Sequence, residues 1–149
     1  MGFSNKKEQE RYYADMLRHI NHNGECAAHN NIELTRVDED YAEGVLHVKP
    51  ESLNYIGAVH GGCLAILADT IAGVAACSRG RGCVTVNYAF NFLRQARGGT
   101  IKCVATPVKV GKTLSVFRVE LTDDEGTLVS AGDFTFHLTG DLIQWLREK

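Results

Sequence analysis

The segment from His60 to Ser78 constrains the fold of this chain more than any other part of the sequence. The segment consists almost entirely of small and apolar residues, so a helix formed by it would be apolar on nearly every side. Gly80 and Gly82 follow it. A helix of this kind is buried inside its domain. Its one carboxylate, Asp69, is expensive to bury unless it is paired or used in chemistry. The sequence therefore predicts a long buried helix, from about His60 to Ser78, with an aspartate in its middle.

Strand-like segments lie on both sides of this helix in the sequence. Turn-forming residues separate consecutive segments, a pattern that is typical of antiparallel hairpins. Pro107 predicts a bulge or a sheet edge in one of them. The expected strands are residues 31–37, 42–49, 84–92, 101–110, 113–121 and 127–138.

The segment 84–92 alternates most clearly between apolar and polar residues. Alternation places every second side chain of a strand on the same face of the sheet. One face is predicted to carry Val84, Val86, Tyr88, Phe90 and Phe92, and the other to carry Thr85, Asn87, Ala89 and Asn91.

These elements predict an α+β fold in which an antiparallel β-sheet wraps around one long central α-helix. A single domain is expected over residues 1–149, with an N-terminal helical extension (1–30), a core (31–138) and a C-terminal tail (139–149). Residues 5–21 are predicted to form an amphipathic helix that covers the domain. Its apolar face would carry Tyr13, Met16, Leu17 and Ile20. Trp145 is expected to pack the tail against the domain.

Composition excludes several classes of protein. The formal net charge is −2, whereas a non-specific nucleic-acid binder would be basic. No apolar run approaches the roughly 20 residues that span a bilayer, so no membrane partner is expected. Residues 1–7 lack the apolar core of a signal peptide. Five cysteines without regular spacing argue against a disulfide framework and for a cytoplasmic protein.

A glycine-rich turn leads directly into the central helix. Such a helix start presents free backbone N–H groups that can bind a negative oxygen, and Gly61 lets a carbonyl approach its N–H closely. Asp69 on the same helix is a candidate nucleophile or general base. An oxyanion donor and a carboxylate on one element together indicate hydrolysis of an acyl group.

The spacing of these two groups has a further consequence. Gly61 and Asp69 are eight residues apart, which is about 12 Å along a helix. Both must lie about 3 Å from one reacting centre. Two antiparallel copies of the helix would allow this, with Gly61 of one subunit facing Asp69 of the other. We therefore expect a homodimer with two shared active sites.

The chain resembles the hotdog-fold acyl-CoA thioesterases, specifically the PaaI-like subgroup of phenylacetic acid degradation. The resemblance rests on Asn54, the run His60-Gly61-Gly62 and Asp69, together with segments 84–87 and 110–114. It implies a homodimer, and members of this family commonly pair such dimers into a homotetramer. It also implies an acyl-CoA substrate that is hydrolysed to a free acid and CoASH, with no cofactor beyond the CoA of the substrate.

The resemblance also assigns roles to individual residues. His60 would orient the thioester or stabilise the loop, and Asn54 would hold His60 or a water, or simply shape the turn. Thr85, a serine in some relatives, would place the attacking water. The expected CoA-binding residues are Gly62, Asn87, Gly111, Lys112 and Thr113. An apolar pocket lined by Val59, Leu64, Ile66 and Leu67 would suit aromatic and medium-chain acyl groups alike.

Three alternatives are weaker. A hydratase or dehydratase on the same fold would need a catalytic histidine paired with a carboxylate. A non-catalytic acyl-CoA sensor would carry an added DNA-binding module, for which residues 1–30 are too short. His19, His22, Cys26 and His29 have spacings compatible with zinc, but we expect no metal there.

Overall fold

The computed structural model describes residues 2–22 and 25–148, with side chains at all of these positions except 145–147. Trp145, expected to pack the tail, therefore lies outside the described side chains. No helix in the described ranges is long and apolar enough to cross a membrane. In chain order the elements are α1 (Lys6–His22), α2 (Cys26–His29), β1 (Ile32–Asp38), β2 (Tyr41–His47), η1 (Pro50–Ser52), α3 (Gly61–Cys77), β3 (Arg81–Phe92), β4 (Thr100–Val110), β5 (Leu114–Thr122), β6 (Leu128–Asp141) and α4 (Leu142–Arg147).

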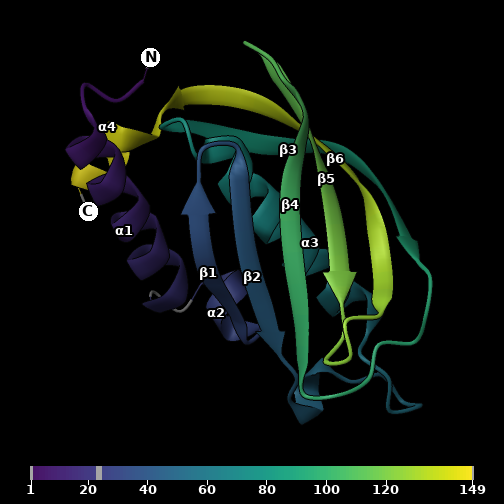
Figure 1. Cartoon of the computed structure of the whole chain (residues 1–149). Helices are drawn as coiled ribbons and strands as arrows, with labels where there is room; N and C mark the ends of the chain where they lie inside the picture. Colours follow the sequence, from purple (N-terminus) through teal and green to yellow (C-terminus); the bar gives the residue numbers. More distant parts are fainter. Residues whose placement is uncertain (1, 23–24, 149) are drawn as a thin grey trace.

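One antiparallel sheet wraps around α3, which confirms the predicted α+β architecture (Figure 1). The strand order is β1-β2-β4-β5-β6-β3. Helix α1 packs beside β1 at one edge of the sheet (Figure 1). At the other edge, β3 pairs with β6 on one side, and no described segment of this chain pairs with its other side. The sheet thus has one covered edge and one open edge.

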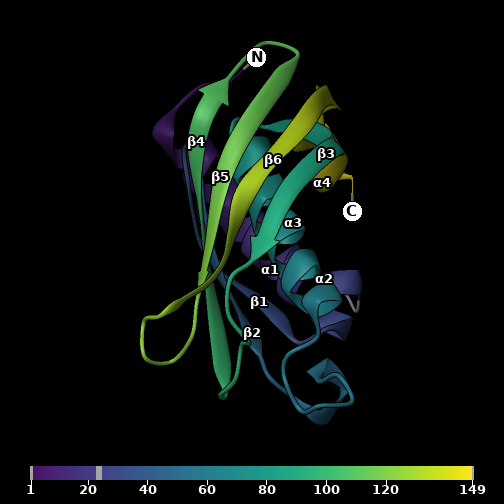
Figure 2. The same cartoon turned by 90° about the vertical axis from the view of Figure 1, so that its right-hand side faces the viewer.

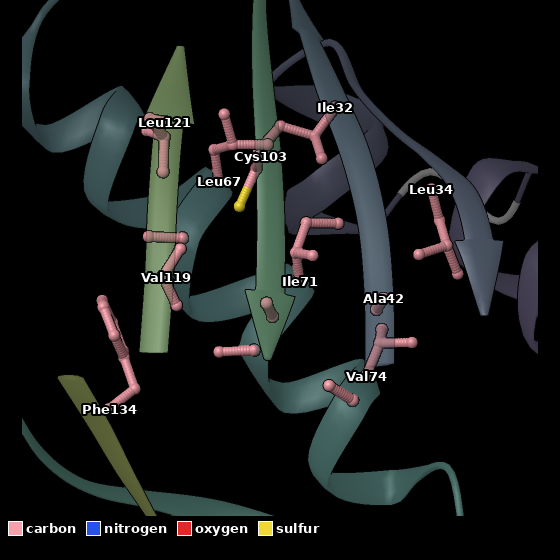
Figure 3. Packing of buried hydrophobic residues seen from close by; sticks show 14 of the residues in the cluster. Ile32, Leu34, Ala42, Leu67, Ile71, Val74, Cys103, Val119, Leu121 and Phe134 are labelled. Carbon is pink, nitrogen blue, oxygen red and sulfur yellow. The ribbon is translucent and has the colours of Figure 1, made fainter. Parts of the chain in front are cut away.

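Helix α3 begins at Gly61 and ends at Cys77, as its apolar composition predicts. Leu67, Ile71 and Val74 point into the sheet and are packed against it (Figure 3). At Gly44 of β2 a Cβ atom would collide with Ile71, so the glycine allows the strand to approach the helix closely.

The prediction that α3 is buried on nearly every side was wrong for part of its surface. Ala65, Ile66 and Asp69 are only half-buried, because the sheet covers one side of the helix and leaves the other side near β3 open. Helix α1 was predicted correctly, but its most buried residue is Tyr12, which the predicted face omitted. The hydroxyl of Tyr12 donates a hydrogen bond of 2.8 Å to the carbonyl of Cys77 and so fastens α1 to the end of α3.

The predicted alternation along β3 was also wrong, because the strand contains a β-bulge. Thr85 pairs with Phe136 and Asn87 with Thr135, so that Val86 is an extra residue. A bulge shifts the side-chain parity by one position. Thr85 therefore faces α3 on one side of the bulge, and Tyr88, Phe90 and Phe92 face the inside on the other. Their ring contacts agree with this, since Tyr88 stacks on the buried ring of Phe134 at 4.7 Å.

Two smaller predictions concern the remaining strands and the tail. A register shift between Pro107 and Lys109 confirms the predicted bulge in β4. The tail forms the short helix α4 after β6 has continued to Asp141. The four-residue helix α2, which follows α1, was not predicted as a separate helix.

Candidate active site

The first turn of α3 is capped by the side chain of His60. The imidazole Nδ1 accepts a hydrogen bond of 2.8 Å from the backbone N–H of Gly62. The backbone N–H of His60 donates to the carbonyl of Ser52 at 2.8 Å. The N–H groups of Cys63 and Leu64 donate to the carbonyl of His60. The N–H of Gly61 has no acceptor among the described residues. One donor at the positive end of the helix is thus left unused.

A pocket of about 370 Å³ opens beside Gly61. Its walls include Val59 and Leu64, two of the four residues predicted to line an apolar pocket, and the polar side chains of Asn54, Arg94 and Gln95 also line it. The other two do not line it, because Leu67 is buried against the sheet and Ile66 is half-buried elsewhere on α3. Phe92 forms another wall, and a Cβ atom on Gly61 would lie 3.4 Å from its ring.

Asp69 lies in the middle of α3, and a hydrogen bond joins its side chain to β3. The hydroxyl of Thr85 donates to Oδ1 of Asp69 at 2.7 Å. Oδ2 accepts no hydrogen bond from the described residues. The β3 bulge sets the face on which Thr85 lies, so the bulge is part of the site. The result is a half-exposed carboxylate with one oxygen held and one oxygen available.

Asn54 shapes the loop before α3. Its carboxamide oxygen accepts hydrogen bonds from the N–H groups of Ile56 and Ala58, both at 3.1 Å. Its backbone N–H donates to the carbonyl of Ala58, and its carbonyl accepts from Gly57. The proposed contact with His60 is not among the hydrogen bonds of the described residues. The turn-shaping alternative is therefore the one that the contacts support.

The predicted CoA-binding residues are spread over the molecule. Gly62 is exposed at the start of α3, and Asn87 is exposed on the face of β3 opposite to that of Thr85. Gly111, Lys112 and Thr113 form the hairpin between β4 and β5. That hairpin projects from the end of the molecule opposite to the segment that leads into α3 (Figure 2). In one chain, therefore, the hairpin and Gly61 do not meet.

The site residues fall into three groups along the length of α3. The start of the helix holds Gly61 and His60, its middle holds Asp69 beside Thr85, and the hairpin lies beyond its far end. Gly61 and Asp69 belong to one uninterrupted helix, which keeps them about 12 Å apart along its axis. Within a single chain, the Gly61 N–H and the Asp69 carboxylate are thus too far apart along the helix to reach the same atom.

Two other kinds of site, a metal centre and a cysteine nucleophile, find little support among the described residues. In the described ranges, no group of three or more histidine, cysteine, aspartate or glutamate side chains could hold a metal ion. His19 of the candidate zinc cluster instead lies 3.1 Å from Glu25. Burial raises the pKa of the Cys63 thiol on α3, which keeps it protonated and a poor nucleophile.

Two residues of interest were missed from the sequence. Phe92 was assigned to a face of β3 but not to the pocket, because the bulge that turns it toward Gly61 has no simple sequence signal. Arg81 contacts the hairpin, with its Nη1 donating to the carbonyl of Lys112 at 2.6 Å. An arginine at the start of a strand is common, so only the fold reveals what it contacts.

Comparisons with known proteins agree on one family. The family model described as the thioesterase superfamily matches residues 56–130. The structure of the Escherichia coli PaaI protein, from the phenylacetic acid degradation operon, superimposes with a TM-score of 0.80. That comparison covers 93% of this chain and 98% of that one at 26% identity.

Two further relatives carry names that mention CoA. The 1,4-dihydroxy-2-naphthoyl-CoA hydrolase of E. coli is 28% identical over 108 residues, which is 70% of this chain and 79% of that protein. A hypothetical thioesterase from Streptococcus pneumoniae, solved with coenzyme A, is 31% identical with a TM-score of 0.71. The match covers 74% of this chain and 88% of that one.

Proposed function

The chain belongs to the thioesterase superfamily and is a thioester hydrolase, and from this premise we propose that its substrate is an acyl-CoA. The products would be a free acid and CoASH. The observation that carries the proposal is the pairing, on one helix, of an unused N–H at Gly61 with the half-exposed carboxylate of Asp69. The CoA thioester hydrolase and the CoA-bound thioesterase among the relatives support the choice of substrate.

In this proposal the Gly61 N–H receives the thioester carbonyl. Negative charge that develops on the carbonyl oxygen is stabilised by this donor and by the positive end of the α3 dipole. His60 contributes by accepting from the next N–H, at Gly62, which fixes the first turn and leaves the Gly61 N–H as the free donor. The acyl group extends into the apolar pocket beside Phe92.

Asp69 supplies the nucleophilic chemistry. It either attacks the thioester carbon to give a mixed anhydride, which water then hydrolyses, or it removes a proton from an attacking water. Thr85 holds Oδ1 of Asp69, and this leaves Oδ2 to face the substrate or the water. In both routes the thiolate of CoA leaves, and no step uses a metal or a redox cofactor.

Two copies of the chain complete the site. If α3 packs against its symmetry mate in antiparallel fashion, Gly61 faces Asp69 of the partner when the two helices cross at residue 65. Position 65 is an alanine on the half-buried side of α3, and a small residue permits such a close crossing. The open edge of β3 is long and carries Val84, Val86 and Tyr88 with about half of each side chain exposed. An edge of this kind favours pairing with a second copy.

The first test is release of CoA thiol from a panel of thioesters, from acetyl-CoA to palmitoyl-CoA, with phenylacetyl-CoA and hydroxyphenylacetyl-CoA included. A chromogenic thiol reagent reports release, and a substrate-free control corrects for the protein's own thiols. Asp69→Asn keeps the shape of the side chain but removes its charge. We expect turnover by the wild type and almost none by Asp69→Asn. Undiminished turnover by the folded variant would remove Asp69 from the mechanism.

The N–H of Gly61 is tested by substitution with proline. Gly61 is the first residue of α3, where proline is well tolerated, and His60 before it has φ −61° and ψ 133°, which suit a residue that precedes proline. Gly61→Pro therefore removes the N–H with little effect on the helix. Gly61→Ala is the matched control, because it adds a Cβ atom and keeps the N–H. We expect kcat to fall about a hundredfold in Gly61→Pro relative to Gly61→Ala.

A further inference from the structure

The guanidinium of Arg81 joins three segments at the end of the molecule beyond α3. Its Nη1 donates to the carbonyl of Lys112 at 2.6 Å, and its Nε and Nη2 donate to the carbonyl of Thr139 at 3.3 and 3.2 Å. Arg81 thereby connects the first residue of β3 to the end of β6 and to the β4–β5 hairpin. All three contacts are to neutral oxygens, so none of them compensates the positive charge.

No described carboxylate forms an ion pair with Arg81. The register partner of Arg81 across the sheet is Asp141, but Oδ1 of Asp141 accepts from the N–H groups of Ile143 and Gln144 at the start of α4. Lys112 is exposed and also lacks an ion pair with any described side chain. Two uncompensated cations therefore lie on adjacent backbone segments, an arrangement that attracts an anion.

We propose that Arg81 binds a phosphate group of CoA directly, together with Lys112, an inference that rests on the acyl-CoA thioesterase function proposed above. A guanidinium has five N–H donors, and Arg81 uses one of them on the hairpin, at Lys112, and two on the carbonyl of Thr139 in β6. The two that remain can donate to phosphate oxygens, which form strong hydrogen bonds with arginine. Arg81 thus has two roles in this proposal, because it fixes the hairpin and also contacts the substrate.

The position of Arg81 along α3 agrees with this role. Asp69 and Cys77 are eight residues apart, so the end of α3 lies about 12 Å beyond the carboxylate, and Arg81 follows shortly after it. Gly61 lies a similar distance from Asp69 in the opposite direction. A thioester held at Asp69 could therefore extend its pantetheine arm toward Arg81 of the same chain, while the partner's helix start takes the carbonyl.

Three thioesters of the same acyl group separate the contributions of the phosphates. The CoA thioester carries every phosphate, the dephospho-CoA thioester lacks only the 3′-phosphate, and the pantetheine thioester has none. The variants are Arg81→Gln, Lys112→Gln and the double variant. Arg118→Gln is the control, because Arg118 is an exposed arginine paired with Asp133 at 3.6 Å on the outer face of the sheet.

We expect Arg81→Gln to raise KM for the CoA thioester about tenfold and to leave kcat and the KM for the pantetheine thioester unchanged. Loss of this effect with dephospho-CoA would assign the contact to the 3′-phosphate, and its persistence would assign it to the pyrophosphate. Either result supports the proposal. An equal rise in KM for all three thioesters would overturn it, because the role of Arg81 would then be structural.

The double variant separates direct binding from an effect through the hairpin. If Arg81 contacts phosphate itself, Arg81→Gln raises KM further when Lys112 is already glutamine. If Arg81 acts only by positioning Lys112, it adds nothing in that background, and the proposal is wrong.

Binding of free CoA, measured by calorimetry, keeps this test independent of catalysis. Should the wild type hydrolyse no thioester, the proposed function fails, yet a tenfold weaker affinity of Arg81→Gln for CoA would still support the phosphate site. Equal affinities, or no binding by the wild type, would overturn it.

Discussion

Among single residues, Thr85 is the one that holds the carboxylate of Asp69 in place. A hydroxyl that donates to a carboxylate at 2.7 Å fixes the orientation of the carboxylate and leaves its second oxygen available. The methyl group that distinguishes threonine from serine takes no part in this bond. Only the hydroxyl at position 85 should therefore matter for turnover.

Two variants of Thr85, one without and one with a hydroxyl, test this expectation. Thr85→Ala is expected to lower kcat about ten- to a hundredfold, since a hydrogen bond to a charged group contributes roughly 1.5–3 kcal/mol. Thr85→Ser, which keeps the hydroxyl, should retain most of the wild-type kcat. Steady-state kinetics on one acyl-CoA decide the question. A wild-type kcat in Thr85→Ala would show that the bond has no catalytic role.

Buried serines give a second prediction, on stability. The hydroxyl of Ser130 is the buried side-chain oxygen that finds no partner among the described residues, whereas that of Ser78, also buried, accepts from the N–H of Asp40 at 2.8 Å. Removing an unpaired hydroxyl costs nothing in hydrogen bonding, but removing a paired one leaves a donor unsatisfied. In urea unfolding, Ser130→Ala should match or exceed the wild-type free energy of unfolding, and Ser78→Ala should lose about 1–2 kcal/mol. The reverse order would contradict these contacts.

At the scale of elements, the start of α3 combines stability with function. His60 caps the helix through Nδ1, so His60→Ala should cost about 1 kcal/mol of unfolding free energy. Serine is a better helix cap than alanine, and His60→Ser should recover that loss. We also expect His60→Ser to recover kcat/KM, because the capped turn is what presents the Gly61 N–H. Recovered stability with activity still lost would mean that the imidazole itself contacts the substrate.

The sequence predicts the helix and strands of this fold, but not the bulge in β3 or the contacts that depend on it. The apolar composition of α3 and the turn signals between strands identify the long helix and the strands that surround it, and the motif around Gly61 and Asp69 identifies the chemistry. The bulge at Val86 was out of reach, because an unbroken alternation of residue types looks the same with or without an extra residue. The contacts of Arg81 and Phe92 depend on that strand's register, so they could not be predicted either.

At the scale of the whole molecule, the open edge of β3 is the expected dimer interface. Lysines at Val84 and Val86 would be repeated on a two-fold partner, and like charges facing each other across paired strands are destabilising. We expect Val84→Lys/Val86→Lys to be a folded monomer by light scattering and circular dichroism, and to have lost activity. Val108→Lys is the control, since Val108 is an equally exposed valine at the bulge of β4. A fully active dimer of the double variant would exclude this edge as the interface.

We expect each active site to take Gly61 from one copy of the chain and Asp69 from the other, and a heterodimer of two inactive variants tests this. Gly61→Pro and Asp69→Asn chains are expressed together with different tags, and the heterodimer is isolated by two affinity steps. One of its two sites then contains both wild-type groups, so the heterodimer should hydrolyse acyl-CoA at about half the wild-type rate. Each homodimer of the variants should be almost inactive. A verified heterodimer without activity would contradict the shared site, because each active site would then need Gly61 and Asp69 from the same chain.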